Sequence, residues 1–579
     1  MQTIKDLGKY TFECLLKNSV KLFKDRPAVS FAHEKPITYG EFYNKMRSVQ
    51  RLLVSVGVRA GDHIAILSPS SPFWGIAYFS IVLMGCVAVP LLHDFTKSEL
   101  ASCIAHSGAK TIFVANKMID KLKNIDVLDV VIELEDFNMI KGKENEDEKA
   151  VEMSFNHECK EDDIASIIYT SGTTGRSKAV MLTHKNLIFT AIAGQETQRI
   201  NKYDRAVSIL PLSHVYEFTI GFLMFMLNGA CVYYLGGPPV PRILLPCLSK
   251  VRPQFMLVVP IVIEKIYKQK VLPALNNSKL LKFLYSHKLT KKFVLRKIGK
   301  KLVKTFGGRL KFFGIGGAKI DPLVEQFMKD ARFPYAIGYG LTETSPLVVS
   351  SPRGKTRVGY LGKQVRGIEV RLEDMDETTG VGELVVRGAN VMKGYYKDTE
   401  LTAKAFTYDG FFKTGDLCKI DKKGWITLMG RSKNMILGPS GENIYPEDIE
   451  FVINQHPLVS ESLVIEGENQ ALVAYVKLDE EKVEEAMKEE ATKEEKATSF
   501  TERMSSTFSE ISESIVYKKE ELLNEIKYFI NSNVNRMNRV DSIQEVSEFE
   551  KTASQKIKRY LYQKDKKTED KESMKCQKV

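Results

Sequence analysis

Glycines and hydroxyl side chains surround one lysine in YTSGTTGRSKAVMLTH, residues 169–184, which comes directly after the strand-like segment IASII (164–168). Glycines let backbone N–H groups approach phosphate oxygens, hydroxyl groups donate hydrogen bonds to them, and lysine supplies positive charge. After a strand, this composition predicts a phosphate-binding loop rather than a flexible surface loop. Gly172 and Gly175 are only three residues apart, so the GxxxxGK[ST] spacing of P-loop NTPases is excluded.

On both sides of this loop, apolar runs that suit strands alternate with helical patterns. The runs are HIAILS (63–68), KTIFVA (110–115), VVIEL (130–134), AVSILPL (206–212), FMLVVP (255–260) and RLKFFGIGG (309–317). Repeated strand–helix–strand order is typical of an α/β fold with largely parallel sheets.

The length of 579 residues predicts more than one domain. We expect a large N-terminal domain of stacked α/β sheets over 1–430. Within it, short strands and turns replace the alternating pattern from about 354. That change predicts a β-rich subdomain at about 354–430. A smaller α+β domain then covers 431–579. It contains a charged segment at about 479–525, either a solvated helical insertion or a disordered excursion.

Two long uncharged stretches, 71–92 and 218–237, have about the length that spans a membrane. Each contains a glycine, Gly85 or Gly229, followed by a β-rich piece. We therefore predict a buried helix, a turn and a buried strand in each case, and no transmembrane span. The N-terminus has no apolar signal-peptide core.

Composition sets further limits. The net charge of +12 indicates either an anionic partner or a lysine-rich background. The eight cysteines lack CxxC pairs or zinc-site spacing, which predicts reduced thiols in a cytoplasmic protein. No nucleic-acid recognition motif is present, so we exclude nucleic acid as a partner.

Six further motifs occur along the chain. They are LPLSHVYEF (210–218), GIGGAKID (314–321), GYGLTETSP (338–346), KTGDLCKIDKKGWITLMGRSKNMI (413–436), GENIYPEDIE (441–450) and EKTASQKIKRYLY (550–562). Together with TSGTTG-x-x-K, the set resembles in type and order the motifs of the adenylate-forming enzymes. The resemblance implies a large domain followed by a small mobile one. It also implies activation of a carboxylate by ATP with Mg²⁺, and transfer of the acyl group to a thiol, usually that of coenzyme A.

The resemblance also implies roles for individual residues. Lys556 is the expected catalytic lysine, Glu343 and Thr170 the magnesium ligands, Thr342 an α-phosphate contact, and Lys433 the hinge. His214 would line the entrance between the ATP and acyl sites. The expected nucleotide contacts are Thr170, Ser171, Gly172, Thr173, Thr174, Gly175 and Lys178 in the loop, Gly316, Gly317, Ala318, Tyr339 and Gly340 at adenine, and Asp416 and Arg431 at ribose.

Structural alternatives exist for several of these residues. Glu343 fits a helix-capping pattern, Asp416 a turn cap, and Tyr339 or His214 a core position. Lys556 has basic neighbours that would form a solvated patch, so motif register alone singles it out.

The acyl substrate is indicated by two segments. VVPIVIEKIYKQ (258–269) resembles long-chain acyl-CoA synthetases, which implies a long-chain fatty acid–CoA ligase. Residues 282–304 hold nine Lys or Arg and no acid, spaced as in a helix. This helix would either lie on an anionic membrane or be solvated.

Some alternatives remain open at this stage. The acceptor could be a carrier-protein thiol, the acid an aryl or medium-chain one, or the chain a non-catalytic nucleotide- or lipid-binding relative. Ser177, Ala179 and Gln555 depart from the family pattern, which bears on rate and acceptor. The oligomeric state is left open.

Overall fold

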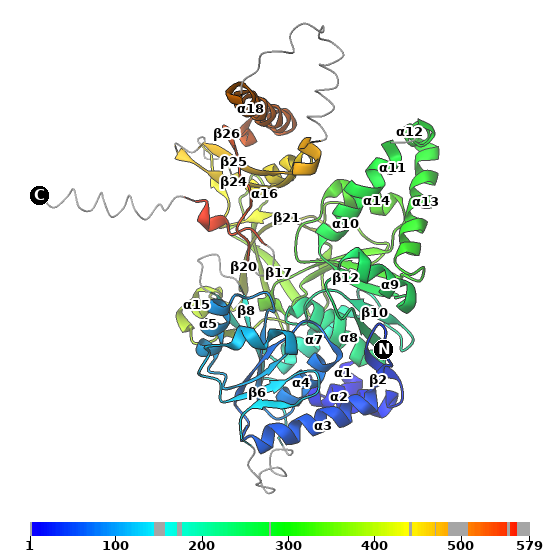
Figure 1. Ribbon diagram of the computed structural model, residues 1–579, viewed down its shortest axis with the longest axis vertical. Coiled ribbons are helices and arrows are strands. Elements are labelled where there is room, and N and C mark those ends of the chain that lie inside the picture. Colours follow the sequence, from blue (N-terminus) through cyan, green and yellow to red (C-terminus); the bar gives the residue numbers. More distant parts are fainter. Residues whose placement is uncertain are drawn as a thin grey trace, which may run out of the picture. The chain divides into compact units, whose positions relative to one another are not determined.

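A computed structural model (Figure 1) describes residues 3–143, 157–170, 177–276, 279–438, 443–468, 471–484, 508–552 and 556–563. The chain forms two compact units. The first covers Met1–Thr170, Ser177–Thr414 and Cys418–Leu428, and the second includes Gly415–Leu417 and Met429–Val579. Each has its own buried apolar core. The domain boundary predicted at 430 to 431 stays a prediction.

The first unit contains two large sheets. The nine-stranded sheet has the order β16-β15-β14-β13-β12-β10-β11-β1-β2. Its strands are β1 (Pro27–Phe31), β2 (Ile37–Thr38), β10 (Arg205–Ser208), β11 (Cys231–Tyr234), β12 (Phe255–Val258), β13 (Phe312–Ile315), β14 (Tyr335–Tyr339), β15 (Val349–Ser351) and β16 (Lys363–Gln364). The six central strands are parallel, as the sequence predicts.

The eight-stranded sheet has the order β19-β9-β8-β4-β3-β5-β6-β7. Its strands are β3 (His63–Leu67), β4 (Val87–Leu91), β5 (Thr111–Val114), β6 (Val130–Glu133), β7 (Met139–Lys141), β8 (Ile164–Thr170), β9 (Lys178–Thr183) and β19 (Gly394–Tyr395). Strands β3, β4, β5, β6 and β8 are parallel. The α/β fold class is therefore confirmed.

The two uncharged stretches form buried core, as predicted. In the first, α4 (Pro72–Val82) begins where Ser71 Oγ accepts a hydrogen bond from Trp74 N, and Gly85 turns the chain into β4 with φ of 73°. Helix α4 contacts β3 and β4 of one sheet and β1 of the other. Since it touches both sheets, apolar residues surround it on all sides.

The second stretch starts as a π-helix, η2 (Glu217–Leu223), and continues as α8 (Met224–Asn228) before Gly229 turns the chain into β11. Among the described residues, no helix is both long and apolar enough to cross a bilayer.

The remaining helices of the first unit pack around the sheets. They are α1 (Ile4–Leu7), α2 (Phe12–Phe23), α3 (Tyr39–Ser55), α5 (Lys97–Ser107), η1 (Asn116–Leu122), α7 (His184–Gly194), α9 (Pro241–Val251), α10 (Pro260–Ile266), η3 (Tyr267–Val271), α11 (Leu272–Asn276), α12 (Lys279–Ser286), α13 (Lys288–Thr305), α14 (Pro322–Asp330), η4 (Thr342–Thr344) and α15 (Thr399–Lys404). Side chains of α9, α13 and α14 share a core with β12 and β13.

A smaller sheet, of order β17-β18-β20-β21, holds the short strands predicted to be β-rich. These are β17 (Ile368–Glu373), β18 (Gly382–Gly388), β20 (Phe412–Ile420) and β21 (Ile426–Arg431). Its first strand begins at residue 368, which is 14 residues after the position where short strands and turns replace the strand–helix pattern in the sequence.

The second unit is an α+β arrangement. Its elements are β22 (Ile436–Leu437), β23 (Asn443–Ile444), α16 (Pro446–Ile453), β24 (Val459–Glu466), β25 (Leu472–Leu478), α18 (Phe508–Asn533), η6 (Arg536–Asn538), β26 (Ser542–Glu545) and η7 (Arg559–Leu561). Ile449 and Ile453 of α16 and Ile526 and Ile530 of α18 are buried in one core with strands of the sheet β24-β25-β26. Part of the charged segment, from 508 onward, is thus helical, and 485–507 lie outside the described residues.

Candidate active site

Three of the predicted motifs meet at one edge of the nine-stranded sheet. Strands β10, β13 and β14 are parallel, so their carboxyl ends lie at the same edge. His214 follows β10, Gly316–Ala318 follow β13, and Tyr339 ends β14 just before Thr342 and Glu343. In open α/β sheets, ligands bind outside such carboxyl ends.

Limited space or a positive φ explains why glycine occupies several positions at this edge. A Cβ on Gly316 would lie 3.2 Å from Tyr216 Cζ and 3.3 Å from the Gly338 carbonyl oxygen. Gly317 has φ of 86°, a conformation that favours glycine. A Cβ on Gly340 would lie only 1.5 Å from the Pro346 carbonyl oxygen. These positions keep the backbone open beside Tyr339, which is half-buried.

The phosphate loop is framed by a strand pair. Thr170 ends β8 and Lys178 begins β9, and the two residues are direct partners in the antiparallel ladder. The predicted contacts Ser171, Gly172, Thr173, Thr174 and Gly175, in 171–176, lie outside the described residues.

Ala179, where the family pattern favours glycine, is an ordinary strand residue. It pairs with Tyr169, is 3% exposed, and its carbonyl oxygen accepts a 2.8 Å hydrogen bond from Tyr396 N. It is not among the described residues with positive φ, so its methyl group causes no backbone strain. Gln555 lies outside the described residues, and Ser177 is exposed.

Tyr395 joins the phosphate-loop strand to the magnesium motif. Its hydroxyl donates a 3.0 Å hydrogen bond to Glu343 Oε1, and Lys178 Nζ lies 5.0 Å from its ring centroid. Burial and the neighbouring Glu343 raise the pKa of Tyr395, so its hydroxyl stays protonated and donates. Lys178, Tyr395 and Glu343, from three separate parts of the chain, form what we call the polar corner.

The capping interpretation of Glu343 is not what the structure has. In the short helix η4, the side chain that meets the N-terminal backbone is Thr344, whose Oγ1 accepts a 2.8 Å hydrogen bond from Leu341 N. The Glu343 carboxylate instead accepts from Tyr395, and the Glu343 carbonyl oxygen accepts from Met392 N. Thr342 is half-buried beside it.

Asp416 and Arg431 are brought together in the second unit. Arg431 Nε lies 2.8 Å from Asp416 Oδ1, and the aspartate side chain is 3% exposed against 41% for the arginine. Ser432 N and Oγ both donate to the Gly415 carbonyl oxygen. Asp416 therefore has a charged partner that holds its carboxylate.

Lys556 lies in the second unit, next to an antiparallel bridge between Lys551 and Ile557. Its backbone N–H donates to Thr552 Oγ1, Thr552 N donates to its carbonyl oxygen, and its side chain is exposed. Its basic neighbours are not a solvated patch. Lys551 lies 2.7 Å from Glu461, Lys558 lies 3.7 Å from Glu550, and Arg559 pairs with the half-buried Glu450. Lys433, the predicted hinge, is exposed in the turn after Arg431.

A family model described as "AMP-binding enzyme" matches residues 16–396, most of the first unit. The chain belongs to the AMP-binding enzyme family. A long-chain-fatty-acid–CoA ligase of Mycobacterium bovis is 29% identical over 483 residues, with 77% of this chain and 78% of that protein covered. A 2-succinylbenzoate–CoA ligase of Listeria innocua is 25% identical over 459 residues, with 78% and 85% covered.

The fold is shared with solved members of the adenylate-forming enzymes. The O-succinylbenzoate coenzyme A synthetase from Bacillus subtilis, solved in complex with AMP, superimposes with a TM-score of 0.72 at 20% identity. The match covers 95% of this chain and 98% of that one.

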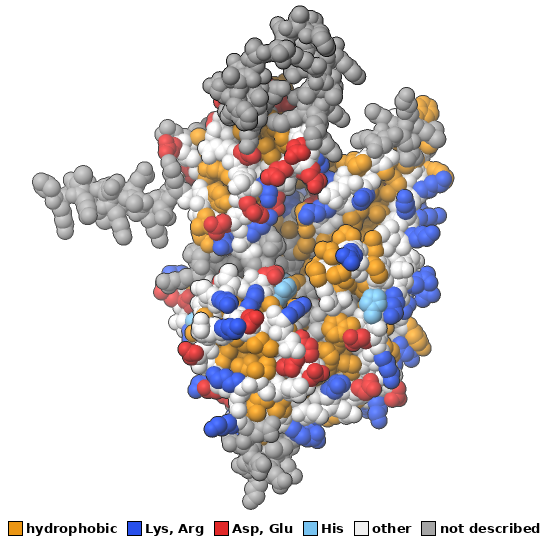
Figure 2. All heavy atoms as spheres, viewed as in Figure 1, with side chains coloured by type: hydrophobic (Ala, Val, Ile, Leu, Met, Phe, Trp, Pro, Cys, Tyr) orange, Lys and Arg blue, Asp and Glu red, His pale blue; other side chains and the backbone are white. Residues whose placement is uncertain are grey.

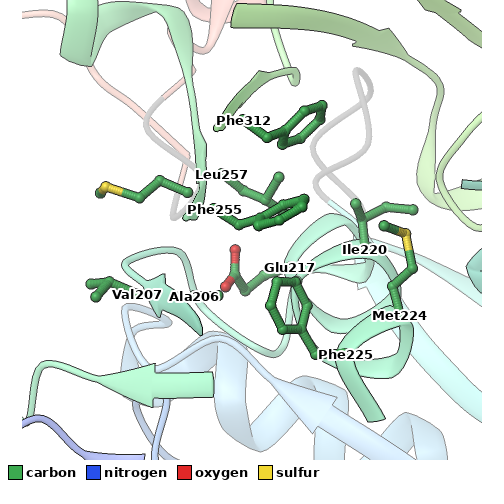
Figure 3. Close-up of a pocket in the computed structure, with 11 residues that line it drawn as sticks. Ala206, Val207, Glu217, Ile220, Met224, Phe225, Phe255, Leu257 and Phe312 are labelled. Atoms are coloured by element: carbon green, nitrogen blue, oxygen red, sulfur yellow. The ribbon is translucent and has the colours of Figure 1, made fainter. Parts of the chain in front are cut away.

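This AMP-binding enzyme has two adjoining cavities behind its sheet edge. Both are lined by Ile220, Met224, Leu257 and Phe312, and the second, of about 30 Å³, reaches Tyr216 and Gly338 near the predicted adenine motif. Figure 3 shows the first, with the carboxyl group of Glu217 among apolar side chains from η2, β10 and β12. His214 is half-buried one turn before these residues.

Glu217 is 2% exposed, and its Oε2 has no hydrogen-bond partner among the described residues. Burial raises the pKa of Glu217 to about 8, and the nearby Ser208 hydroxyl offsets this only in part. The carboxyl group is therefore neutral at pH 7, as an apolar wall requires.

Tyr395 and Glu217 are site residues that sequence reasoning missed. Glu217 stands inside the quoted motif LPLSHVYEF, so its position could have been questioned there. Tyr395 lies in MKGYYKD (392–398), where nothing in the spacing marks one tyrosine above the other. No cluster of three or more metal-ligating side chains occurs in the described part of the chain.

Proposed function

We propose that this AMP-binding enzyme is an ATP-dependent acid–CoA ligase whose acid is a long-chain fatty acid. The comparisons support an AMP-forming ligase of this general class. The observation that carries the proposal is the polar corner, which holds a cation, a hydroxyl and a carboxylate next to the strands that frame the phosphate loop. The choice of a long-chain acid rests on the relatives that are named for that substrate.

The first step joins the acid to AMP. A carboxylate oxygen attacks the α-phosphorus of ATP, the bond from that phosphorus to the bridging oxygen breaks, and pyrophosphate leaves. In the second step the sulfur of coenzyme A attacks the acyl carbon, the bond to the AMP oxygen breaks, and AMP leaves. The thiol proton is lost to solvent.

The types of residue in the site suit the binding of a triphosphate and of Mg²⁺. Lys178 and Thr170 flank the phosphate loop and supply a cation and a hydroxyl for the triphosphate. Mg²⁺ binds oxygen ligands and keeps several waters and phosphate oxygens, so a single carboxylate such as that of Glu343 suits it. The ion supplies charge neutralisation. The Tyr395 hydroxyl fixes the orientation of that carboxylate.

Two charged groups of the second unit complete the proposal. The Asp416 carboxylate, oriented by Arg431, accepts hydrogen bonds from ribose hydroxyls. Lys556 bonds the acyl oxygen and the α-phosphate during adenylation, where negative charge builds up. The neighbouring cations Lys551, Lys558 and Arg559 each form an ion pair with a glutamate and so have a structural role.

The two cavities have an apolar lining, which suits a hydrocarbon in kind, but their volumes of about 10 and 30 Å³ do not hold an acyl chain as they stand. Their shared lining is Ile220, Met224, Leu257 and Phe312, and an acyl chain buried against it gains about 0.8 kcal/mol per methylene. The space is narrow as it stands, so a long chain requires side chains such as the flexible Met224 to move.

The test is pyrophosphate release from ATP and Mg²⁺ with acids from acetate to oleate, with and without coenzyme A. We expect release to peak with long chains, to need coenzyme A for turnover, and to fall at least 100-fold in Lys556→Ala. Lys558→Ala, two residues away and paired with Glu550, is the matched control and keeps near-normal rates.

Other outcomes would redirect the assignment. Turnover independent of coenzyme A would indicate another acceptor, such as a carrier-protein thiol. A peak with aryl acids would indicate an activity like that named for the succinylbenzoate relatives. ATP binding without pyrophosphate release for any acid would indicate a non-catalytic relative.

A further inference from the structure

One stretch of the first unit accounts for the positive charge of the whole chain. Residues 265–320 contain 16 Lys or Arg and no Asp or Glu. The chain as a whole carries +12, so the other residues together carry −4. The excess of positive charge is therefore concentrated in residues 265–320 and is not spread over the whole chain.

The fold sorts this charge onto one side of a helix. Lys292, Arg296, Lys297, Lys300, Lys301 and Lys304 of α13 are exposed, with Phe293 among them at 59% exposure. At about 100° per residue these seven positions span about half of the helix circumference, with Phe293 near the middle. We call them the cationic face. Figure 2 shows blue side chains gathered along the right-hand edge, where Figure 1 draws α13.

The opposite side of α13 fixes the helix to the unit. Val294, Leu295 and Leu302 are buried in the core shared with α9 and α14. A Cβ on Gly299 would lie 2.2 Å from the Ala331 carbonyl oxygen, so the helix approaches the neighbouring backbone closely. The cationic face therefore points outward along the whole helix, about 27 Å.

Nothing within the described chain neutralises this face. None of its six cations lies within ion-pair distance of a described carboxylate. Lys297 Nζ lies 4.6 Å from the Phe293 ring centroid. The neighbouring helix α12 adds Phe283, which is 61% exposed. Unpaired cations with exposed aromatic rings suit a surface that has an anionic outer layer and an apolar layer beneath it.

We propose that the cationic face of α13, with Phe283 of α12, docks this protein onto an anionic lipid bilayer. The cations meet phosphate headgroups, and the two phenylalanine rings enter the boundary between headgroups and acyl chains. A helix anchored along its inner side lies parallel to such a surface rather than crossing it. A polyanion such as RNA offers the charge but no apolar layer for the rings, so we favour lipid. The proposal rests on a surface and is independent of the proposed reaction.

The test is sedimentation of the full chain with phosphatidylcholine vesicles, with or without phosphatidylglycerol, in the absence of ATP and acid. We expect binding only when phosphatidylglycerol is present, and weaker binding at high salt. One surface lysine contributes about fivefold in partitioning, so Lys300→Gln/Lys304→Gln lowers it about 25-fold.

Matched variants separate this face from general basic charge. Lys422→Gln/Lys423→Gln removes two exposed lysines elsewhere in the same unit and leaves partitioning unchanged. Phe293→Ser lowers the part of the binding that survives high salt. Thermal melting checks that each variant is folded.

Three results would overturn the proposal. They are equal binding to vesicles without phosphatidylglycerol, equal loss in the Lys422/Lys423 control, and displacement from vesicles by polyuridylate at equal phosphate concentration. The last would assign the face to nucleic acid.

Discussion

Two glutamates of the first unit, Glu343 and Glu217, have opposite surroundings. Glu343 lies in the polar corner, where its Oε1 accepts a hydrogen bond from Tyr395, and Lys178 Nζ lies 5.0 Å from the centroid of that tyrosine ring. Glu217 lies behind it in the wall of the apolar cavity, where its Oε2 finds no partner among the described residues.

The difference shows how one side chain type serves two purposes. The Tyr395 hydroxyl orients the Glu343 carboxylate, an oxygen ligand of the kind that Mg²⁺ prefers. Burial without a partner holds the other carboxyl neutral, because ionising it in an apolar wall costs more than keeping its proton. The predictions below test this contrast with variants of each glutamate and of the group that contacts it.

The largest effect is expected from Glu343→Gln. Loss of the negative charge removes the proposed magnesium ligand, so pyrophosphate release falls about 100- to 1000-fold while the melting temperature changes little. The apparent magnesium requirement in the same assay rises. Glu196→Gln, at an exposed carboxylate of the same unit, is the control. Near-normal release at saturating magnesium would show that Glu343 has no such role.

Glu217→Gln tests the neutral glutamate. In the unfolded chain Glu217 ionises above about pH 4.5, and in the folded chain only above about pH 8. Unfolding therefore releases a proton within that window, and stability decreases as the pH rises through it.

Glutamine has no proton to release. The variant should gain about 3–4 kcal/mol over the parent between pH 5 and pH 8, measured as the difference in the free energy of chemical unfolding at each pH. A difference that is the same at both pH values would mean that Glu217 is ionised in the fold.

Gly221→Ala tests the space that the π-helix leaves for Glu217. A Cβ at Gly221 would lie 2.7 Å from Glu217 Oε1, so the carboxyl group must move, at a cost of about 1–2 kcal/mol. In a Glu217→Ala background the same substitution should cost nothing, since the clash is gone. An equal cost in both backgrounds would trace the effect to the backbone instead.

The smallest effect is expected from Tyr395→Phe. The ring that Lys178 faces is kept, and only the hydrogen bond to Glu343 is lost, so pyrophosphate release falls about fivefold. The loss should appear mainly as a higher magnesium requirement. A loss as large as that of Glu343→Gln would mean that the hydroxyl itself contacts a reacting group.

Local sequence patterns are enough to predict the fold class and most of the strands. Alternating apolar runs and punctuating glycines such as Gly85 and Gly229 are local signals, and the predicted parallel sheets are confirmed. The motifs also indicate the family, because residue types at fixed spacing within one segment can be recognised without knowing the fold.

Which residues from different segments come into contact depends on how the whole chain folds. The contacts of Tyr395 with Glu343 and Lys178 join positions 395, 343 and 178, and no periodicity links residues so far apart. The same holds for the neutral state of Glu217, which depends on the apolar side chains around it. It holds as well for the outward direction of the lysines on α13, since the buried side of a helix is set by the elements that pack against it.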